Sequence, residues 1–238
     1  MPRRLTIGHV AEAIFQDRRD AGRMLAQAVA FVPALRDAVV LGLARGGVPV
    51  AYEVALACNL PLDVLIVRKL GVPRHRELAM GAVASGGAVV LNSYILEDFR
   101  VSDQTLQETI ARQKAEIERL ESMYRAGRPA PEFGEGGVIL VDDGLATGAT
   151  MRAAVRAVRP SAEHVTIAVP VAAKSTCDEL RQEVDSVICV ATPESLDAVG
   201  RFYRDFTPTS DEEVRALLAD AGKTRGPWVR EQGSANPL

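Results

Sequence analysis

The sequence predicts an α/β fold in which helices cover both faces of a mainly parallel sheet. Five short runs rich in Val, Ile and Leu alternate with stretches whose apolar residues have helical spacing. Continuous apolar runs of this kind are typical of strands buried on both faces, as in doubly wound sheets. The composition, 47% hydrophobic but only 5% aromatic, also suits helices packed on a sheet better than a β-sandwich.

The expected elements alternate along the chain as a doubly wound sheet requires. We expect strands over 38–43, 62–67, 137–141, 164–171 and 186–190, and helices over 17–32, 48–58, 150–158 and 174–183. Ligands of such folds bind beyond the carboxyl ends of the strands. The Gly-rich turns of this sequence fall at those ends, which is where we expect the functional site.

A long insertion separates the second and third of these strands. Residues 79–92 resemble a hairpin with Ser85-Gly-Gly87 as its turn. A helix is expected over 101–125, with Ser102 as its N-cap. Its apolar face either packs on its own domain or serves as a dimer contact or an arm over the active site. We expect one domain over 1–221, with an insertion at about 72–134, a hood at about 192–221 and a flexible tail over 222–238.

Charge and cysteine content exclude several classes of partner. The formal net charge of −3 offers no basic footprint for nucleic acid or an anionic membrane. The cysteines, Cys58, Cys177 and Cys189, have neither disulfide-framework nor zinc-site spacing. No run of about 20 apolar residues is present. We therefore expect a soluble protein in a reducing, cytoplasmic setting.

The most informative segment is Val138-Ile-Leu-Val-Asp-Asp-Gly-Leu-Ala-Thr-Gly-Ala-Thr150. A buried strand ends in two carboxylates, and a loop of small residues then leads into a helix. Backbone N–H groups of such a loop, together with the positive end of the helix dipole, form an anion site suited to phosphate. Carboxylates repel phosphate, so Asp142 and Asp143 are expected to face hydroxyl groups of the same ligand. The alternative is an ordinary strand–turn–helix corner with two solvated aspartates.

This segment resembles the signature of type I phosphoribosyltransferases. Gly144 departs from it, because a larger apolar residue or Ser is more usual after the acidic pair. The resemblance implies that Asp142 and Asp143 contact the ribose 2- and 3-hydroxyls of phosphoribosyl pyrophosphate (PRPP). It implies that the loop holds the 5-phosphate. The expected PRPP-binding residues are Asp142, Asp143, Gly144, Leu145, Ala146, Thr147, Gly148, Ala149 and Thr150.

Two basic segments upstream are candidates for the pyrophosphate group. Arg45 lies beside Gly46 and Gly47, which can take positive φ, after the first strand, and Arg68-Lys69 follows the second. Both resemble pyrophosphate-contacting segments of the same family. We expect catalysis to depend on Asp142, Asp143, Arg45 and Lys69.

Two further segments are less specific. Residues Arg74, His75 and Arg76 serve either in a lid over the substrates or as a solvated basic turn. Phe202, Tyr203 and Phe206 either stack on an acceptor base or fill the core beneath a terminal helix.

The combined interpretation is an enzyme that transfers ribose 5-phosphate from PRPP to a nitrogen acceptor and releases pyrophosphate. Mg²⁺ is the implied cofactor, bound through PRPP and water near the acidic pair and not held directly by protein ligands. The alternatives are a sensor that binds PRPP without turnover, and a diphosphokinase-like enzyme, for which no ATP site is evident. The acceptor is not specified by the sequence, and a homodimer is a hypothesis from the long helix.

Overall fold

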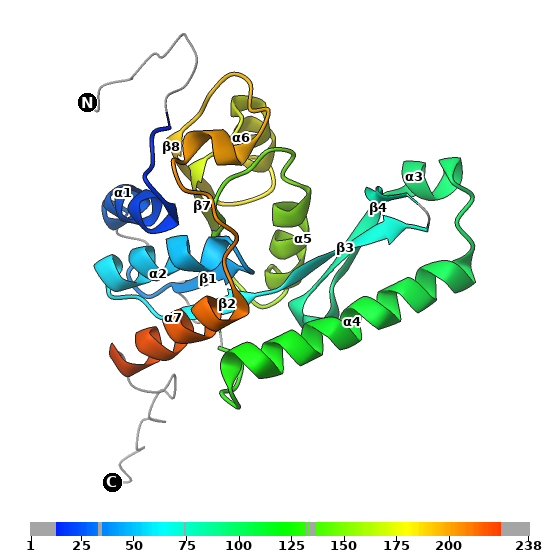
Figure 1. Cartoon of the computed structure of the whole chain (residues 1–238), viewed down its shortest axis with the longest axis horizontal. Coiled ribbons are helices and arrows are strands. Elements are labelled where there is room, and N and C mark those ends of the chain that lie inside the picture. The colour runs from blue at the N-terminus through cyan, green and yellow to red at the C-terminus, as the bar shows by residue number, and fades with distance from the viewer. Residues whose placement is uncertain (1–12, 33–34, 74, 132, 134–136, 225–238) are drawn as a thin grey trace, which may run out of the picture.

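The core of the structure is a five-stranded parallel sheet (Figure 1). The computed structural model describes residues 13–32, 35–73, 75–131, 133 and 137–224, without the side chains of residues 76, 77 and 224. The strands are β1 (Val39–Leu43), β2 (Leu62–Leu65), β6 (Val138–Val141), β7 (Val165–Val171) and β8 (Ser186–Ala191), in the order β2-β1-β6-β7-β8. Each neighbouring pair is parallel.

Helices cover both faces of this sheet, as predicted. One face packs on α1 (Arg18–Ala30), α2 (Gly47–Cys58) and α7 (Asp211–Thr224), and the other on α5 (Ala149–Val158) and α6 (Lys174–Leu180). Successive strand residues point to opposite faces, so Ile139 lies in the first core and Leu140 in the second. The doubly wound α/β fold is confirmed.

The insertion forms an arm (residues 67–125) that extends from one side of the core (Figure 1). It contains an antiparallel sheet of β3 (Val67–Val72), β4 (His75–Ala84) and β5 (Val89–Leu91), then α3 (Ser93–Asp98) and α4 (Asp103–Arg125). The predicted hairpin corresponds to β4 and β5, with Ser85–Gly87 as its turn. Ser102 caps α4 as expected, accepting a hydrogen bond from the backbone N–H of Thr105.

The prediction of one strand over 62–67 is wrong. The chain leaves the main sheet after Leu65 and enters the arm sheet at Val67. Ile66 lies between them, and its backbone N–H and carbonyl oxygen both bond to Ser85, at 3.0 and 2.8 Å. This non-local contact, 19 residues away, has no signature in an otherwise continuous apolar run. The arm therefore begins near residue 67, before the predicted boundary at about 72.

Helix α4 packs its apolar face on its own chain. Its buried residues are Leu106, Thr109, Ile110, Ile117, Leu120 and Tyr124, and its neighbours are β3, β4 and α7. Of the predicted alternatives for the apolar face of α4, packing on its own domain is therefore the one that the structure shows.

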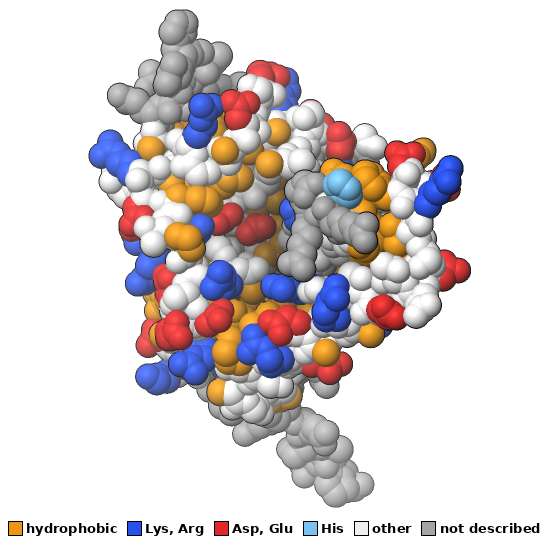
Figure 2. All heavy atoms as spheres, turned by 45° about the vertical axis from the view of Figure 1, so that its right-hand side comes forward, with side chains coloured by type: hydrophobic (Ala, Val, Ile, Leu, Met, Phe, Trp, Pro, Cys, Tyr) orange, Lys and Arg blue, Asp and Glu red, His pale blue; other side chains and the backbone are white. Residues whose placement is uncertain are grey.

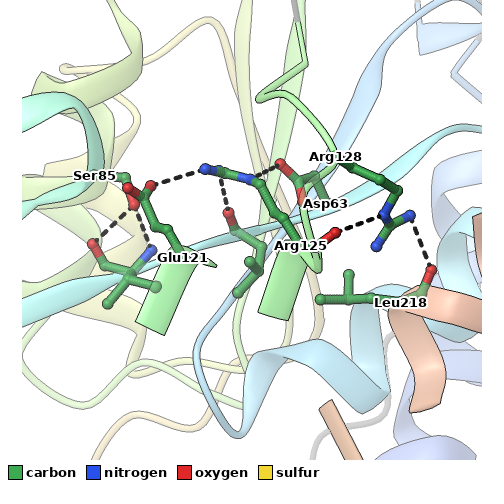
Figure 3. Close-up of polar contacts among 8 residues, drawn as sticks. Asp63, Ser85, Glu121, Arg125, Arg128 and Leu218 are labelled. Atoms are coloured by element: carbon green, nitrogen blue, oxygen red, sulfur yellow. Dashed lines mark hydrogen bonds and ion pairs between the residues drawn. The ribbon is translucent and has the colours of Figure 1, made fainter. Parts of the chain in front are cut away.

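A polar network attaches the C-terminal end of α4 to the core (Figure 3). Arg125 donates from Nε to Asp63 of β2 at 2.9 Å and from Nη2 to the carbonyl oxygen of Val64 at 3.3 Å. Arg128 donates from Nη1 to the carbonyl oxygen of Leu218 in α7 at 3.2 Å. These bonds fix the base of the arm against the sheet and α7.

The predicted end of the hood is also corrected. Helix α7 runs to Thr224 and packs on α2, α4 and β2, so residues 211–221 cover the core. Residues 222–224, predicted as the start of a tail, are helical. Residues 225–238 lie outside the described residues. None of the helices in the described part of the chain is long and apolar enough to span a membrane.

Candidate functional site

The candidate site lies where the winding of the sheet changes direction. From β1 the chain crosses to β2 on one side, while β6 pairs with β1 on the other, with Gly42 opposite Val141. The turns after β1 and β6 therefore begin at adjacent strand ends and lead the chain to opposite sides of the sheet. This is the topological switch point at which open α/β sheets bind ligands.

The two turns touch directly. A Cβ added at Gly46 would lie 2.1 Å from Asp143 Oδ2, and one added at Gly47 would lie 2.5 Å from the carbonyl oxygen of Val141. Neither glycine has positive φ, so the reason predicted for them is wrong. They are required because the backbone after β1 approaches the acidic pair too closely for any side chain.

The acidic pair is half-buried and ordered by the backbone. The backbone N–H of Asp143 donates to Asp142 Oδ1 at 2.9 Å, and the hydroxyl of Tyr203 donates to the carbonyl oxygen of Asp143 at 2.6 Å. Burial raises the pKa of Asp142 well above its ordinary value, and the neighbouring Asp143 carboxylate raises it further. Burial also raises the pKa of Asp143, while the Arg18 guanidinium opposes that rise. Hydroxyl donors are suitable ligands for this pair, because they stabilise the charged form.

The loop after the acidic pair opens α5. Gly148 adopts φ of 71° as the N-cap residue, and no side chain caps the helix. The N–H groups of the first turn are therefore left for a ligand or solvent. Ala146, Thr147 and Ala149 are exposed, and Thr150 is half-buried. This geometry suits a phosphate group.

Side chains from other segments donate hydrogen bonds to the carbonyl oxygens of the loop that precedes α5. Thr176 donates from its hydroxyl to the carbonyl oxygen of Ala146 at 2.7 Å, and Arg152 donates to that of Thr147 at 3.1 Å. Arg152 is itself paired with Glu179 and Glu183 of the α6 region. Its charge is thus balanced, and its contact is with the loop backbone.

Comparison with known proteins identifies the family of this chain. The family model of the phosphoribosyl transferase domain matches residues 12–205. The chain belongs to the phosphoribosyl transferase domain family. It is 44% identical over 206 residues to the Mycobacterium tuberculosis protein named "Putative phosphoribosyl transferase Rv0571c", and equally so to the one named MT0597. These matches cover 86% of this chain and 46% of each relative, so the chain spans about half their length.

A solved structure of similar size also matches. The crystal structure of TT1426 from Thermus thermophilus is 43% identical, with a TM-score of 0.73. The match covers 87% of this chain and 98% of that one.

Gly144, the departure from the usual family signature, has a packing reason. A Cβ at this position would lie 2.5 Å from Val199 Cγ1 and 3.0 Å from Val171 Cγ1. Val199 begins the short helix η3 (Val199–Phe202) that follows the last strand of the sheet. The missing side chain thus makes room for the segment above the acidic pair.

The structure separates the basic residues that the sequence grouped together. Arg68 and Lys69 lie inside β3 and not in a turn, and adjacent strand residues point to opposite faces. Arg68 shares the face of Leu70 and donates to Gln113 of α4 at 3.1 Å. Lys69 shares the face of Val67, which packs on the core that includes α5. Of the two, Lys69 therefore lies on the strand face that is turned toward the core with α5.

Arg45 occupies the turn after β1, as predicted. Its side chain is half exposed, and its Nη1 lies 3.6 Å from Asp211 Oδ1 at the start of α7. The hydroxyl of Tyr124 donates to the same oxygen at 2.6 Å. A loose, solvent-exposed pair of this kind leaves Arg45 able to turn toward an anion.

The candidate lid lies at the connection between β3 and β4. His75 opens β4, and its ring lies 5.4 Å from that of Phe99 in the arm. Arg74 and the side chain of Arg76 lie outside the described residues. On the face shown in Figure 2, acidic and basic side chains lie together in a hollow between the core and the arm.

The aromatic cluster fills the core for the most part. Phe202 and Tyr203 are buried with Phe15 and Ala21, beneath the N-terminal helix α1. Phe206 is half-buried and makes a cation–π contact with Arg18, whose Cζ lies 3.9 Å from the ring centroid. The core interpretation therefore fits Phe202 and Tyr203, whereas Phe206 belongs to the site.

Arg18 is the site residue that sequence reasoning missed. Its Nε donates to Asp143 Oδ2 at 2.8 Å from the first turn of α1. The two residues are 125 positions apart, and Arg18 is one of several charged residues near the start of that helix. No local pattern distinguishes it. Among the described residues, no group of three or more His, Cys, Asp or Glu side chains is placed to hold a metal ion.

Proposed function

We propose that the chain is a PRPP-dependent phosphoribosyltransferase that transfers ribose 5-phosphate to a nitrogen acceptor, such as a nucleobase or a similar heterocycle. One observation carries the proposal: the acidic pair and the uncapped start of α5 lie on one loop, and the Arg-Gly-Gly turn packs against it at the switch point. A sugar phosphate suits both halves of that loop, and a pyrophosphate suits the turn.

In this proposal each part of the site has one role. The N–H groups of the loop over 146–150 bind the 5-phosphate, and Asp142 and Asp143 accept hydrogen bonds from the ribose hydroxyls. The acceptor nitrogen forms a bond to ribose C1 as the bond from C1 to the pyrophosphate oxygen breaks. Pyrophosphate leaves with the electron pair, and the proton of the acceptor N–H passes to solvent or to the leaving pyrophosphate. Arg45 and Lys69 stabilise the charge on that leaving group.

The residues present also fit Mg²⁺ held through the substrate. Adjacent carboxylates are hard oxygen donors, and their mutual repulsion is reduced by a nearby cation or by its bound water. When bound, the ion would neutralise negative charge on pyrophosphate. Arg68, which faces α4, is proposed to support the arm and not to bind the leaving group.

The test combines ligand binding with pyrophosphate release. Wild-type protein, Mg²⁺ and PRPP are incubated with a panel of nucleobases and related heterocycles, and PRPP affinity is measured by calorimetry. We expect release with at least one acceptor, and at least a roughly 100-fold loss of PRPP affinity in Asp143→Asn, about 2.7 kcal/mol. The melting temperature should change little, because Asn keeps an oxygen acceptor for Arg18.

The matched control is Asp197→Asn, which alters an exposed carboxylate paired with Arg201 and should behave as wild type. Saturable PRPP binding without release on any acceptor would favour the sensor. Failure of the wild-type protein to bind PRPP would overturn the proposal.

A further inference from the structure

The segment above the acidic pair joins two parts of the chain that are far apart in the sequence, near residue 15 and near residue 203. The backbone N–H of Phe15 donates to the carbonyl oxygen of Phe202 at 2.9 Å, and that of Arg204 donates to the carbonyl oxygen of Phe15 at 2.9 Å. Asp205 then bonds to Gln16 in the same way at 2.8 Å. The start of α1 is thus joined to the hood segment (residues 196–207), and Arg18 is the first residue of that helix.

Arg18 is bound on three sides. Its Nε donates to Asp143 Oδ2 at 2.8 Å, and its Nη1 donates to the carbonyl oxygen of Thr207 at 2.7 Å. The guanidinium also lies over the ring of Phe206. Only 11% of the side chain is exposed, against 16% for Asp143. A guanidinium with this many contacts has little freedom to move, so it fixes the carboxylate that it touches.

The contacts from neighbouring residues use only one oxygen of each carboxylate. Asp142 Oδ1 receives the N–H of Asp143, and Asp143 Oδ2 receives Arg18. In the part of the chain that the structure describes, no other residue donates a hydrogen bond to the second oxygen of either side chain. Each carboxylate therefore keeps one oxygen for a ligand hydroxyl while the protein holds its orientation.

Other groups around the pair leave Arg18 as its nearest countercharge. Asp142 repels Asp143, Tyr203 contacts the backbone of Asp143 through an uncharged hydroxyl, and Gly46 adds no side chain. The Arg18 charge favours ionisation of both carboxyls against the effect of burial. Without it, two adjacent half-buried carboxylates would tend to share a proton.

We infer that Arg18 is a positioning residue of the ribose site: it holds Asp143 with one oxygen facing the ligand and links the acidic pair to the hood segment. This inference rests on the proposed function, because the ligand whose hydroxyls meet Asp143 is PRPP in that proposal. Arg18 itself acts through Asp143 and does not contact the ribose.

The experiment compares Arg18→Gln, Arg18→Lys and the control Arg201→Gln, which removes an exposed arginine of the same hood segment. The affinity for PRPP with Mg²⁺ is measured by calorimetry between about pH 6 and about pH 8.5, and thermal unfolding is followed in parallel. We expect Arg18→Gln to weaken binding at least tenfold at neutral pH. Its loss of affinity on the acid side should begin at higher pH than in wild type. Arg18→Lys should recover part of both effects, and Arg201→Gln should match wild type.

The outcomes separate the two proposals. Wild-type affinity and pH profile in Arg18→Gln would overturn the role of Arg18, and so would tighter binding, which would mean that Arg18 competes with the ligand for Asp143. If Arg18→Gln does not fold, Arg18→Lys decides: an intermediate loss with a shifted profile supports the role, and wild-type behaviour overturns it. Absence of PRPP binding by the wild-type protein overturns the proposed function itself.

Discussion

Two arginine–aspartate pairs of nearly the same geometry lie in different regions of this molecule. Arg18 and Asp143 meet at 2.8 Å in the candidate site, and Arg125 and Asp63 meet at 2.9 Å where the arm joins the core. Both pairs join Nε to Oδ2, and all four side chains are at most 16% exposed. Burial raises the pKa of each aspartate, and each arginine opposes that rise.

The two pairs differ in what surrounds them. Arg125 also bonds to Glu121 and to the carbonyl oxygen of Val64, so its pair is part of a network within the arm and β2. Asp143 instead borders a second carboxylate, a glycine turn and the exposed start of α5. A buried ion pair whose neighbours satisfy one another stabilises a junction. The Arg18–Asp143 pair leaves acceptor oxygens beside the uncapped start of α5, which is the arrangement that the proposed function requires.

The largest expected effect comes from breaking the junction. Arg125→Met leaves Asp63 buried without its main countercharge, and we expect the free energy of unfolding to fall by about 3 kcal/mol. Urea denaturation measures this change, and calorimetry should give wild-type PRPP affinity for the folded protein. The control is Arg119→Met on the same helix, which removes an exposed pair with Glu116 and should cost at most about 0.5 kcal/mol. Equal losses in the two variants would contradict the comparison.

A smaller effect is expected from one methyl group placed next to the Arg18–Asp143 pair. Gly46→Ala brings a Cβ against Asp143 Oδ2 and within 3.2 Å of Arg18 Nε, so the pair must separate or the turn must move. We expect roughly a tenfold loss of PRPP affinity and a loss of about 1–3 kcal/mol of stability.

The matched change beside the junction is Gly222→Ala in α7. Its Cβ would meet only the terminal Nη1 of Arg128, at 2.8 Å, which can move away while Nε keeps its bond to the carbonyl oxygen of Arg125. We expect stability and PRPP affinity to remain close to wild type. A large loss here, or none in Gly46→Ala, would show that close packing does not distinguish the two regions.

The smallest expected effect concerns pH. Because the folded pKa of Asp142 is raised above 3.8, the folded state binds its proton more readily than the unfolded chain does. This carboxyl therefore favours folding below about pH 3.8, and the contribution is lost as pH rises through its raised pKa. Asp142→Asn removes the charge, so the variant should gain stability relative to wild type as the pH rises from about 4.5 to about 7.5. Urea denaturation at both pH values measures the difference, and a pH-independent difference would contradict the assignment.

Much of the fold could be predicted because its signals are local. Continuous apolar runs indicated the buried strands. Asp17 caps helix α1, and Ser102 caps helix α4. The acidic pair and the loop that opens α5 are one contiguous segment, so their place at a strand end followed from the sequence. The strand that ends at Leu65 was misjudged because the contact that divides it comes from Ser85.

Local sequence was therefore sufficient to predict the α/β architecture and to place the acidic pair, the loop after it and the two glycines at strand ends. It did not predict the close approach that requires those glycines. Which charged residues belong to the site depends on how distant segments pack together. Strand alternation turned Arg68 toward α4 and Lys69 toward α5, and the pairing of segment 13–17 with the hood segment brought Arg18 onto Asp143. Main-chain conformation and burial leave periodic patterns in neighbouring residues, whereas an ion pair between positions 125 residues apart depends only on where the folded chain places them.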